Sequence, residues 1–579
     1  MELFIKTTRA KGFEYIKLVE SYRENGTTKH RVLFNFGRAD LIKKDESFIR
    51  IVKRLCEIAD LALTDASANA TSSLDGCSEA TLYNYGYLAY RALWNELGLQ
   101  DCLEEVESTT KISYSLSETV FLMAIQHLLD PRSKLSTHQH QWQYFDMNEI
   151  NLHHMYRALD ILCENKEEIE SGLFEYNYTR VHKQVDVVFY DVTTVSFESV
   201  VADELRNFGF SKECKFNEVQ VVMGMIIDSD GMPVGYELFP GNTFDGKTMV
   251  KALDNIKKRF GISRVIIVAD RGLNSRGNLN LIKEAGYGYI MASKIRGMSA
   301  AMKKKILDPD GFTTVADTSE DKSGSSESDS FRYKVIPYLN IFTDENKVKH
   351  TLSENLVISF SPKRARKDAA DRQRLIEKAK KMLEDPEKIK ASNRRGGKKY
   401  IDQSSPETTQ WKLAVERIEE DAQFDGYYGI QSSEKNMSAT EIMDAKALLW
   451  KIEESFRIMK STLEIQPVFH WNAERIRGHF VVCFLAFLME RRMEHLPKST
   501  DDGCVSSPER IREALLSMQL AAVSVDGRER FIKTKTSSLA HKIFKKLSLE
   551  LPACISEKED VLALYKHLYE PLATQLTIL

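Results

Sequence analysis

Three apolar stretches decide the fold of this 579-residue chain: VDVVFYDVTTVSF (185–197), VQVVMGMIIDSDGMPVGYELFPGNT (219–243) and SRVIIVADRG (263–272). The first and third are runs of β-branched and aromatic residues, typical of strands buried on both faces of a sheet. The second divides into two strands at Asp230-Gly231, a dipeptide that favours tight hairpins. This part of the chain therefore predicts a meander of three strands and then a fourth strand.

Two helices and a further strand complete the segment. Residues 248–260 (TMVKALDNIKKRF) have the spacing of an amphipathic helix, and RGNLNLIKEAG (276–286) reads as a second one. A fifth strand, YGYIMASK (287–294), follows. Strands and helices in this order predict an α/β fold built on a mixed sheet.

The N-terminal flank has a different pattern. Two β-rich runs surround Asn25-Gly26 and predict a hairpin. Between residues 48 and 145, apolar residues recur at the spacing of amphipathic helices, and Pro131 is expected to end one of these helices. The hairpin carries basic side chains: Lys6, Arg9, Lys11, Arg23, Lys29 and Arg31.

The C-terminal flank begins with a loosely patterned region. Residues 319–330 are half serine and predict a flexible loop, and residues 361–401 hold fifteen Lys or Arg against six Asp or Glu, a net charge of 15 − 6 = +9. Long helices are predicted at 440–461 and 472–495. Residues 496–579 are expected to be mostly helical.

Composition excludes several classes of protein. Hydrophobic residues make up 42% and charged residues 28%, as in globular proteins, and the net charge of −3 means that any nucleic-acid affinity must come from local basic patches. The eight cysteines include no C-x-x-C pair, which argues against a zinc ribbon or a disulfide scaffold. The longest apolar run, 480–489, is half a membrane span, and the N-terminus has no apolar signal core. We expect a cytosolic protein.

Two acidic residues occupy positions where α/β sheets bind ligands. Asp191 closely follows the apolar run of the first strand, and Asp270 ends the strand SRVIIVAD. Ligand sites of open sheets lie where strands end and loops begin. Two neighbouring carboxylates repel each other unless a cation lies between them, and Mg²⁺ prefers such oxygen ligands.

A third acid, Glu453, lies in the predicted helix DAKALLWKIEESFRIMKS (444–461). A stripe at helical spacing would pack on the sheet; it comprises Ile442, Ala445, Leu449, Ile452, Phe456 and Met459. Beside it, a second face contains Lys446, Trp450, Glu453, Arg457 and Lys460. A carboxylate between cations suits a metal site that also holds a polyanionic strand.

Each feature also has an ordinary structural explanation. A strand-end aspartate is more often a turn residue, and Glu453 with Arg457 at i+4 is more often a solvated helix pair. The basic segment 361–401 is as readily a solvated helix as a phosphate contact. The combination of two strand-associated aspartates, a helical glutamate and a basic insert is much more specific.

That combination resembles the RNase H-like core of DDE transposases, and above all the insertion-sequence transposases with a large β-rich insertion before the third acid. The resemblance covers most of residues 1–495. The matching stretches are TRAKGFEYIKLVESYRENG (8–26), LYNYGYLAYRALWNELGL (82–99), YDVTT (190–194), QVVMGMIIDSDGMPVGYELFPGNT (220–243), VADRG (268–272), WKIEESFRIMK (450–460), PVFHW (467–471) and RIRGHFVVCFLAFLMERRME (475–494).

The resemblance implies that Asp191, Asp270 and Glu453 are the catalytic residues. The family signature around the last acid is Tyr, two residues, Arg, three residues, Glu, six residues, Lys; Glu453 and Lys460 fit it, whereas Lys446 and Leu449 stand at the Tyr and Arg positions. We hypothesise that Lys446 takes over part of the missing phosphate contact. The gap of 453 − 270 = 183 residues agrees with an inserted subdomain.

The implied domains are an N-terminal DNA-end-binding region (1–175), a core in two parts (180–296 and 441–495), an insertion (297–440) and a helical C-terminal region (496–579). The implied activity is cut-and-paste DNA transposition. The three acids would bind two Mg²⁺ ions, with Mn²⁺ as a substitute. A homodimer on paired transposon ends is expected, in the cytoplasm of a bacterial or archaeal cell at the nucleoid. Expected DNA contacts are Lys460, Arg457, Lys446, Arg271, Arg394, Arg395, Lys398 and Lys399.

Two alternatives remain open at this point. One is a metal-dependent nuclease on the same core, which cuts DNA but does not join it. The other is a non-catalytic DNA-binding protein derived from such an element.

Overall fold

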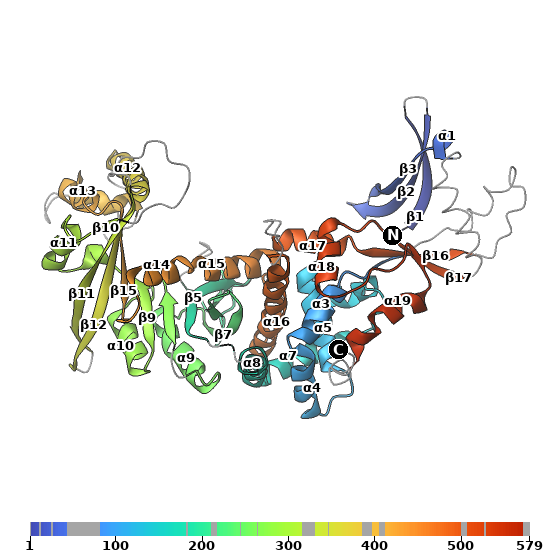
Figure 1. Cartoon of the computed structure of the whole chain (residues 1–579), viewed down its shortest axis with the longest axis horizontal. Helices are drawn as coiled ribbons and strands as arrows, with labels where there is room; N and C mark the ends of the chain where they lie inside the picture. The colour runs from blue at the N-terminus through green and yellow to red at the C-terminus, as the bar shows by residue number, and fades with distance from the viewer. Residues whose placement is uncertain are drawn as a thin grey trace, which may run out of the picture. The chain divides into compact units, whose positions relative to one another are not determined.

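The structure is a computed structural model (Figure 1). It divides into two compact units, one formed by Met1–Lys183 with Arg457–Leu579 and the other by Gln184–Phe456. The described residues are 2–10, 13–24, 27–42, 81–180, 183, 185–209, 217–243, 245–262, 265–314, 330–344, 347–384, 396–403, 411–498, 507–525 and 528–570.

A nine-stranded mixed sheet forms the centre of the second unit, in the order β10-β11-β12-β15-β9-β8-β5-β6-β7. β5 runs parallel to β8, and β8 runs parallel to β9, whereas β6 and β7 are antiparallel. This is the predicted RNase H-like mixed sheet. Its core elements are β5 (Val187–Ser196), β6 (Gln220–Asp228), β7 (Pro233–Pro240), α9 (Asp245–Lys258), β8 (Ile266–Ala269), α10 (Arg276–Glu284) and β9 (Gly288–Ala292).

The predicted hairpin at Asp230-Gly231 is confirmed. Gly231 has a φ of +88°, which glycine adopts without steric cost, and its N–H donates to the carbonyl of Asp228. β6 is buried along its whole length. α9 and α10 lie on one face, and α14 (Ala439–Ala447) crosses β8, β9 and β15 on the other (Figure 1).

Residues 297–440, the predicted insertion, add four strands of the described residues to this same sheet. β15 (Tyr427–Ser432) pairs antiparallel with β9, and β12 (Lys349–Phe360) pairs with β15. Among the described residues of this segment, a separate two-stranded sheet and three α-helices accompany these strands. The other insertion elements are α11 (Ala300–Leu307), β10 (Thr313–Thr314), β11 (Arg332–Thr343), α12 (Pro362–Leu383), β13 (Ile401–Gln403), β14 (Trp411–Leu413) and α13 (Val415–Ala422).

The single helix predicted over 440–461 is wrong. α14 ends at Ala447, α15 spans Trp450–Arg457, and a π-helical segment, η7, covers Ile458–Thr462. No glycine or proline marks the break, so sequence periodicity could not reveal it. The predicted apolar stripe nevertheless lies inward, since Ile442 and Ile452 are buried.

The first unit begins with a three-stranded antiparallel sheet of β1 (Glu2–Ala10), β2 (Phe13–Glu24) and β3 (Thr27–Arg38). Glu24 faces Thr27, which confirms the predicted hairpin, although Asn25 and Gly26 lie outside the described residues.

A helical core follows in the same unit. α16 (Ala473–Lys498), which matches the helix predicted at 472–495, packs against α3 (Leu88–Glu96), α5 (Leu116–Leu129) and α7 (Leu152–Glu164). The apolar run Phe480–Met489 is buried in this core. A search of the described helices found none with the length and hydropathy to cross a bilayer. The remaining helices here are α1 (Ala39–Ile42), α4 (Leu99–Ser108), α6 (Lys134–His140), η1 (Gln141–Gln143), α8 (Lys166–Phe174) and the π-helical η2 (Glu175–Thr179).

The C-terminal region contains strands that the prediction of a helical region lacked. β16 (Gln519–Val525) pairs with β4 (Thr81–Asn84) from the other end of the chain and with β17 (Arg528–Lys533). β18 (Ile555–Ser556) completes this sheet. The accompanying helices are α17 (Pro508–Leu516), α18 (Ser538–Lys546), α19 (Lys558–Tyr565) and the 3-10 turn η8 (Lys566–Tyr569).

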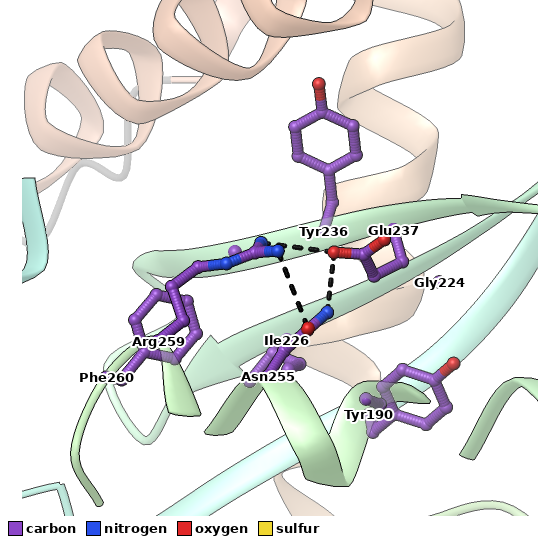
Figure 2. A pocket seen from close by; sticks show the side chains of 10 residues that line it. Tyr190, Gly224, Ile226, Tyr236, Glu237, Asn255, Arg259 and Phe260 are labelled. Carbon is purple, nitrogen blue, oxygen red and sulfur yellow. Dashed lines mark hydrogen bonds and ion pairs between the residues drawn. The ribbon is translucent and has the colours of Figure 1, made fainter. Parts of the chain in front are cut away.

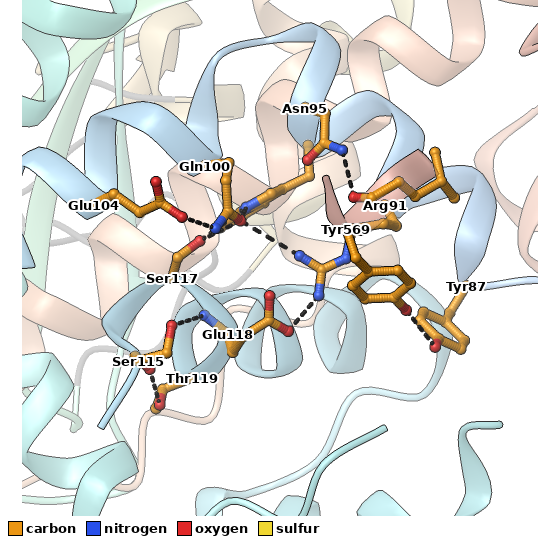
Figure 3. Close-up of polar contacts among 12 residues, drawn as sticks. Tyr87, Arg91, Asn95, Gln100, Glu104, Ser115, Ser117, Glu118, Thr119 and Tyr569 are labelled. Carbon is orange, nitrogen blue, oxygen red and sulfur yellow. Dashed lines mark hydrogen bonds and ion pairs between the residues drawn. The ribbon is translucent and has the colours of Figure 1, made fainter. Parts of the chain in front are cut away.

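Side chains also hold this region to the helical core (Figure 3). The hydroxyl groups of Tyr87 and Tyr569 lie 3.0 Å apart, and Asn95 donates to the carbonyl of Leu568 at 2.7 Å. The Tyr569 ring lies 4.9 Å from the buried guanidinium of Arg91, which pairs with Glu118. The last helices of the chain therefore complete the core that its first helices begin.

Candidate active site

Strand register brings Asp191 and Asp270 together. The last facing pair of the parallel strands β5 and β8 is Tyr190 with Ala269, and each aspartate is the next residue along its strand direction. Neighbouring strands lie about 4.8 Å apart, so the two backbones are adjacent at this point. Asp191 shares a face of β5 with Phe189, whose partner Val268 lies two residues before Asp270.

The placement of Asp191 near a strand end needs correction. β5 continues to Ser196 because its other edge keeps pairing with β6, whereas β8 stops at Ala269. Asp191 is therefore held within a strand, and Asp270 stands at the start of a loop. Consistent with this, the Asp270 side chain is 57% exposed.

Lys446 lies among the acids. Its Nζ is 3.8 Å from Oδ1 of Asp270, and its side chain is buried. Burial lowers the pKa of Lys446, and the carboxylates of Asp270, Glu453 and Asp191 act in the opposite direction. All three predicted acids thus favour the charged form of one ammonium group, which lies 3.8 Å from the carboxylate of Asp270.

Glu453 is presented by the first turn of α15 and is exposed. The preceding residues hold this helix in place: Leu449 and Ile452 are buried, and the Nζ of Lys451 donates to the carbonyl of Ser229 in the β6–β7 turn at 2.5 Å. The break after α14 lets Lys446 and Glu453 approach the same strands from two short helices.

The chemistry of this donor set suits a hard divalent cation. Three carboxylates, two of them exposed, offer only oxygen ligands, and a cationic group already lies beside them. A second group of possible metal ligands lies in the first unit, formed by His127, His479 and Cys483. Among the described residues, this is the group whose ligand atoms all lie within 4.8 Å of one another.

That second group is a buried polar network. The Nζ of Lys134 lies 3.4 Å from Nε2 of His127, whose Nδ1 lies 2.9 Å from the carbonyl of Leu463. Burial lowers the pKa of His127 to about 3 and that of Lys134 to about 8. Because an amine already occupies the position beside His127, we interpret the group as structural. His479 and Cys483 are four residues apart on α16, but His127 lies more than 300 residues earlier, so the sequence did not reveal the group.

Side chains of β6, β7 and α9 gather near Tyr190 of β5 (Figure 2). Tyr190 points there, toward residues of α9. Glu237 of β7 is paired with Arg259 at 3.1 Å and with Lys251 at 3.0 Å. Gly224 is required by close packing, because a Cβ atom there would lie 2.4 Å from the Tyr190 hydroxyl. This packing fixes β5, and with it Asp191.

The predicted DNA contacts have varied surroundings. Arg271 directly follows Asp270 and is exposed, whereas Lys399 is paired with Asp421. Arg457 ends α15 and Lys460 lies in η7. Lys398 is half-buried in a 3-10 turn, and Arg394 and Arg395 lie outside the described residues.

Sequence reasoning missed Tyr428, on β15 of the insertion. Burial raises the pKa of its hydroxyl, Asp270 and Glu453 raise it further, and Arg364 and Arg271 oppose them. The motif DGYYG (425–429) contains only ordinary strand residues after a turn, so its relation to the acids depends on the sheet pairing.

Two known family models match this chain, one at its N-terminal residues and one over the segment that contains the acids. A family model described as the transposase DDE domain matches residues 183–489, and one described as the IS1634 family transposase N-terminal domain matches residues 3–62. No curated protein matches the chain. Among solved structures, a piggyBac transposase in a synaptic complex with hairpin DNA is similar at 10% identity over 81% of this chain and 85% of that one. Its TM-score of 0.34 is too low to support further argument.

The DDE-domain match covers more than half of the chain and contains all three acids. The protein therefore belongs to the DDE transposases of insertion sequences and is a DNA transposase, a polynucleotidyl transferase.

Proposed function

We propose that Asp191, Asp270 and Glu453 are the catalytic carboxylates and that they bind two Mg²⁺ ions, which Mn²⁺ can replace, during cut-and-paste transposition. DDE domains use divalent metal ions, and DNA is the partner of the family. The observation that carries the residue assignment is the shared surroundings of Lys446, whose ammonium interacts with all three acids.

The three carboxylates differ in how firmly they are held. Asp191 lies within a strand that stays paired with β6 on both sides of it, so its backbone is held. Asp270 precedes a loop, and Glu453 lies near the start of a short helix, so both can adjust to the substrate. Bound divalent ions would supply Lewis acidity toward the scissile phosphate and would make water, or later a 3′-hydroxyl, a stronger nucleophile.

Cations near the acids would bind the polyanionic substrate. Lys446 offsets the mutual repulsion of the carboxylates, and Arg271 lies on the exposed loop after Asp270. We propose that Arg457 and Lys460 contact DNA phosphates, together with Arg394, Arg395, Lys398 and Lys399 near the end of the basic segment. We also propose that the residues of 1–175 read the element ends and that two copies act on paired ends.

The test is cleavage of DNA that contains the sequences flanking the reading frame on both sides. Asp191→Asn, Asp270→Asn and Glu453→Gln should each abolish cleavage in Mg²⁺ and Mn²⁺ while leaving DNA binding intact. Asp444→Asn is the matched control, since Asp444 is an exposed acid on α14 and should be dispensable. Wild-type cleavage by any of the three acid variants would refute the assignment.

Joining is measured separately with a pre-cleaved end that carries a free 3′-hydroxyl. The wild-type protein should insert this end into target DNA, and the same three variants should not. Cleavage without joining would identify a nuclease in place of a cut-and-paste transposase.

A further inference from the structure

We propose that Tyr428 and Arg364 of the insertion form a phosphate-binding pair that holds a DNA phosphodiester beside the acidic residues. The assignment rests on the proposed function, because it takes the strand bound at Asp191, Asp270 and Glu453 as the ligand. It gives the insertion a direct part in substrate binding at this site.

The sheet register places Tyr428 on the face that carries the acids. Ile430 faces Ala292 of β9, which is the residue after Met291, the partner of Ala269. Ala292 is therefore level with Asp270, and Tyr428 lies two residues farther along β15 on the same face as Ile430. The backbones of Tyr428 and Asp270 are separated by two strand spacings across the sheet and two residues along it, which is roughly 12 Å. A tyrosine side chain can bridge more than half of that distance.

Electrostatic interactions agree with this placement. The carboxylates of Asp270 and Glu453 both act on the Tyr428 hydroxyl, and so does the guanidinium of Arg271. Because the pKa of this hydroxyl is raised, it is protonated at neutral pH and can donate a hydrogen bond to a phosphate oxygen.

Arg364 is held against the tyrosine ring. It lies in the first turn of α12, where Ser361 caps the helix by accepting from its backbone N–H. The guanidinium carbon is 4.7 Å from the centre of the Tyr428 ring. Its side chain is 47% exposed, and its ion pair with Asp368 at 3.6 Å is of the weak surface kind. A planar cation stacked on a ring and open to solvent is prepared for two parallel hydrogen bonds to a phosphate.

The residues that precede Glu453 do not supply such a pair. Leu449 stands where the family signature has arginine, and it is buried and apolar. Lys446 is buried and engaged with Asp270. In this chain an arginine and a tyrosine reach the acidic site from the insertion instead, through the pairing of β12 and β15 with the core sheet.

The experiment compares Arg364→Gln and Tyr428→Phe with two matched controls. Arg366→Gln removes a charge from the same helix, and Tyr427→Phe changes the neighbouring residue, whose ring packs against Phe360 instead. DNA ends are prepared with a single neutral methylphosphonate at each position near the cleavage point. Affinity is measured with Asp191→Asn protein, so that binding is observed without cleavage.

When Arg364 is present, a methylphosphonate at one or two positions of the DNA should weaken its binding about 10-fold or more. This is the loss expected for one charge-assisted hydrogen-bonded contact. Arg364→Gln should bind unmodified DNA about that much more weakly and should lose its sensitivity at those positions. Tyr428→Phe should show a smaller effect at the same positions, and Arg364→Lys should be intermediate. Both controls should behave as the Asp191→Asn parent.

The pair would be refuted if Arg364→Gln kept the full methylphosphonate profile, or if Arg366→Gln lost as much affinity. Thermal melting of each variant identifies any that fails to fold, and Arg364→Lys then provides the test. The readout is separate from the proposed catalytic role: cleavage by Asp191→Asn would overturn that role and would leave the binding profile interpretable.

Discussion

The ammonium of Lys446 lies 3.8 Å from Oδ1 of Asp270 and is buried, whereas the carboxylate that it faces is exposed. The cation approaches the acids from the protein side, and solvent and substrate approach from the other. Lys446 therefore competes with divalent ions for negative charge at the same carboxylates.

Lys446→Met should strengthen metal binding. Removal of a positive charge about 4 Å from a carboxylate should lower the Mn²⁺ concentration for half-saturation by about 5- to 10-fold. The measurement is the rise in melting temperature with Mn²⁺, which needs no activity. Lys435→Met, a change at an exposed lysine that bonds to Asn355, should leave the titration unchanged. Weaker Mn²⁺ binding by Lys446→Met would show that the lysine supports the site in another way.

Gly224→Ala should destabilise the protein by about 1–3 kcal/mol, since overpacking forces neighbours to move. The added Cβ would lie 2.4 Å from the Tyr190 hydroxyl and 3.1 Å from two ring carbons. Tyr190→Phe removes the closest of these atoms, so the double variant should recover part of the loss. Urea denaturation of the four proteins in this cycle measures the coupling; simple additivity would contradict the packing argument.

Stability should rise with pH between about 4 and 6.5 because of the buried histidines. Burial lowers the pKa of His127 to about 3 and that of His470 to about 4, against an ordinary value of 6.5. In this window the unfolded chain binds more protons than the folded one, so acid favours unfolding. The free energy of unfolding, measured at several pH values, should show a positive slope, and His470→Gln should reduce that slope. An equal slope in His470→Gln would mean that His470 is not buried in its neutral form.

Glu490 should contribute to the pH dependence of stability in the opposite direction to the histidines, and Glu490→Gln should remove that contribution. Burial raises the pKa of Glu490 to about 8, and its Oε2 accepts from the Tyr90 hydroxyl at 2.7 Å. A carboxyl with a raised pKa contributes stability below its ordinary value near 4.5 and loses it as pH rises toward 8. Glu490→Gln should therefore gain in stability relative to wild type between pH 5 and pH 8. Melting temperatures across this range check the sign, and a constant difference would contradict it.

Much of the core could be predicted because its signals are local. The hairpins at Asn25-Gly26 and Asp230-Gly231 depend on turn residues, and the strands of the central sheet depend on continuous apolar runs. The two aspartates were identifiable from their position after such runs. Their catalytic role, with that of Glu453, stays a prediction.

Other features depend on contacts between residues far apart in sequence. The helix over 440–461 breaks without glycine or proline, because burial of side chains such as Leu449 is set by the sheet beneath. β16 pairs with β4, more than 400 residues earlier in the chain, and also with β17, and this pairing turns part of an expected helical tail into a sheet.

The sequence by itself determined the order of strands and helices, the position of the three acids along the chain and the charge of the insertion, because these follow from short-range periodicity and composition. Only the tertiary structure decided that the strands of residues 297–440 extend the core sheet, that Lys446 turns inward to Asp270, and that Arg364 lies against the ring of Tyr428. Strand pairing is a long-range choice of partner and register, and a shift of β15 by one residue would turn Tyr428 to the opposite face of the sheet.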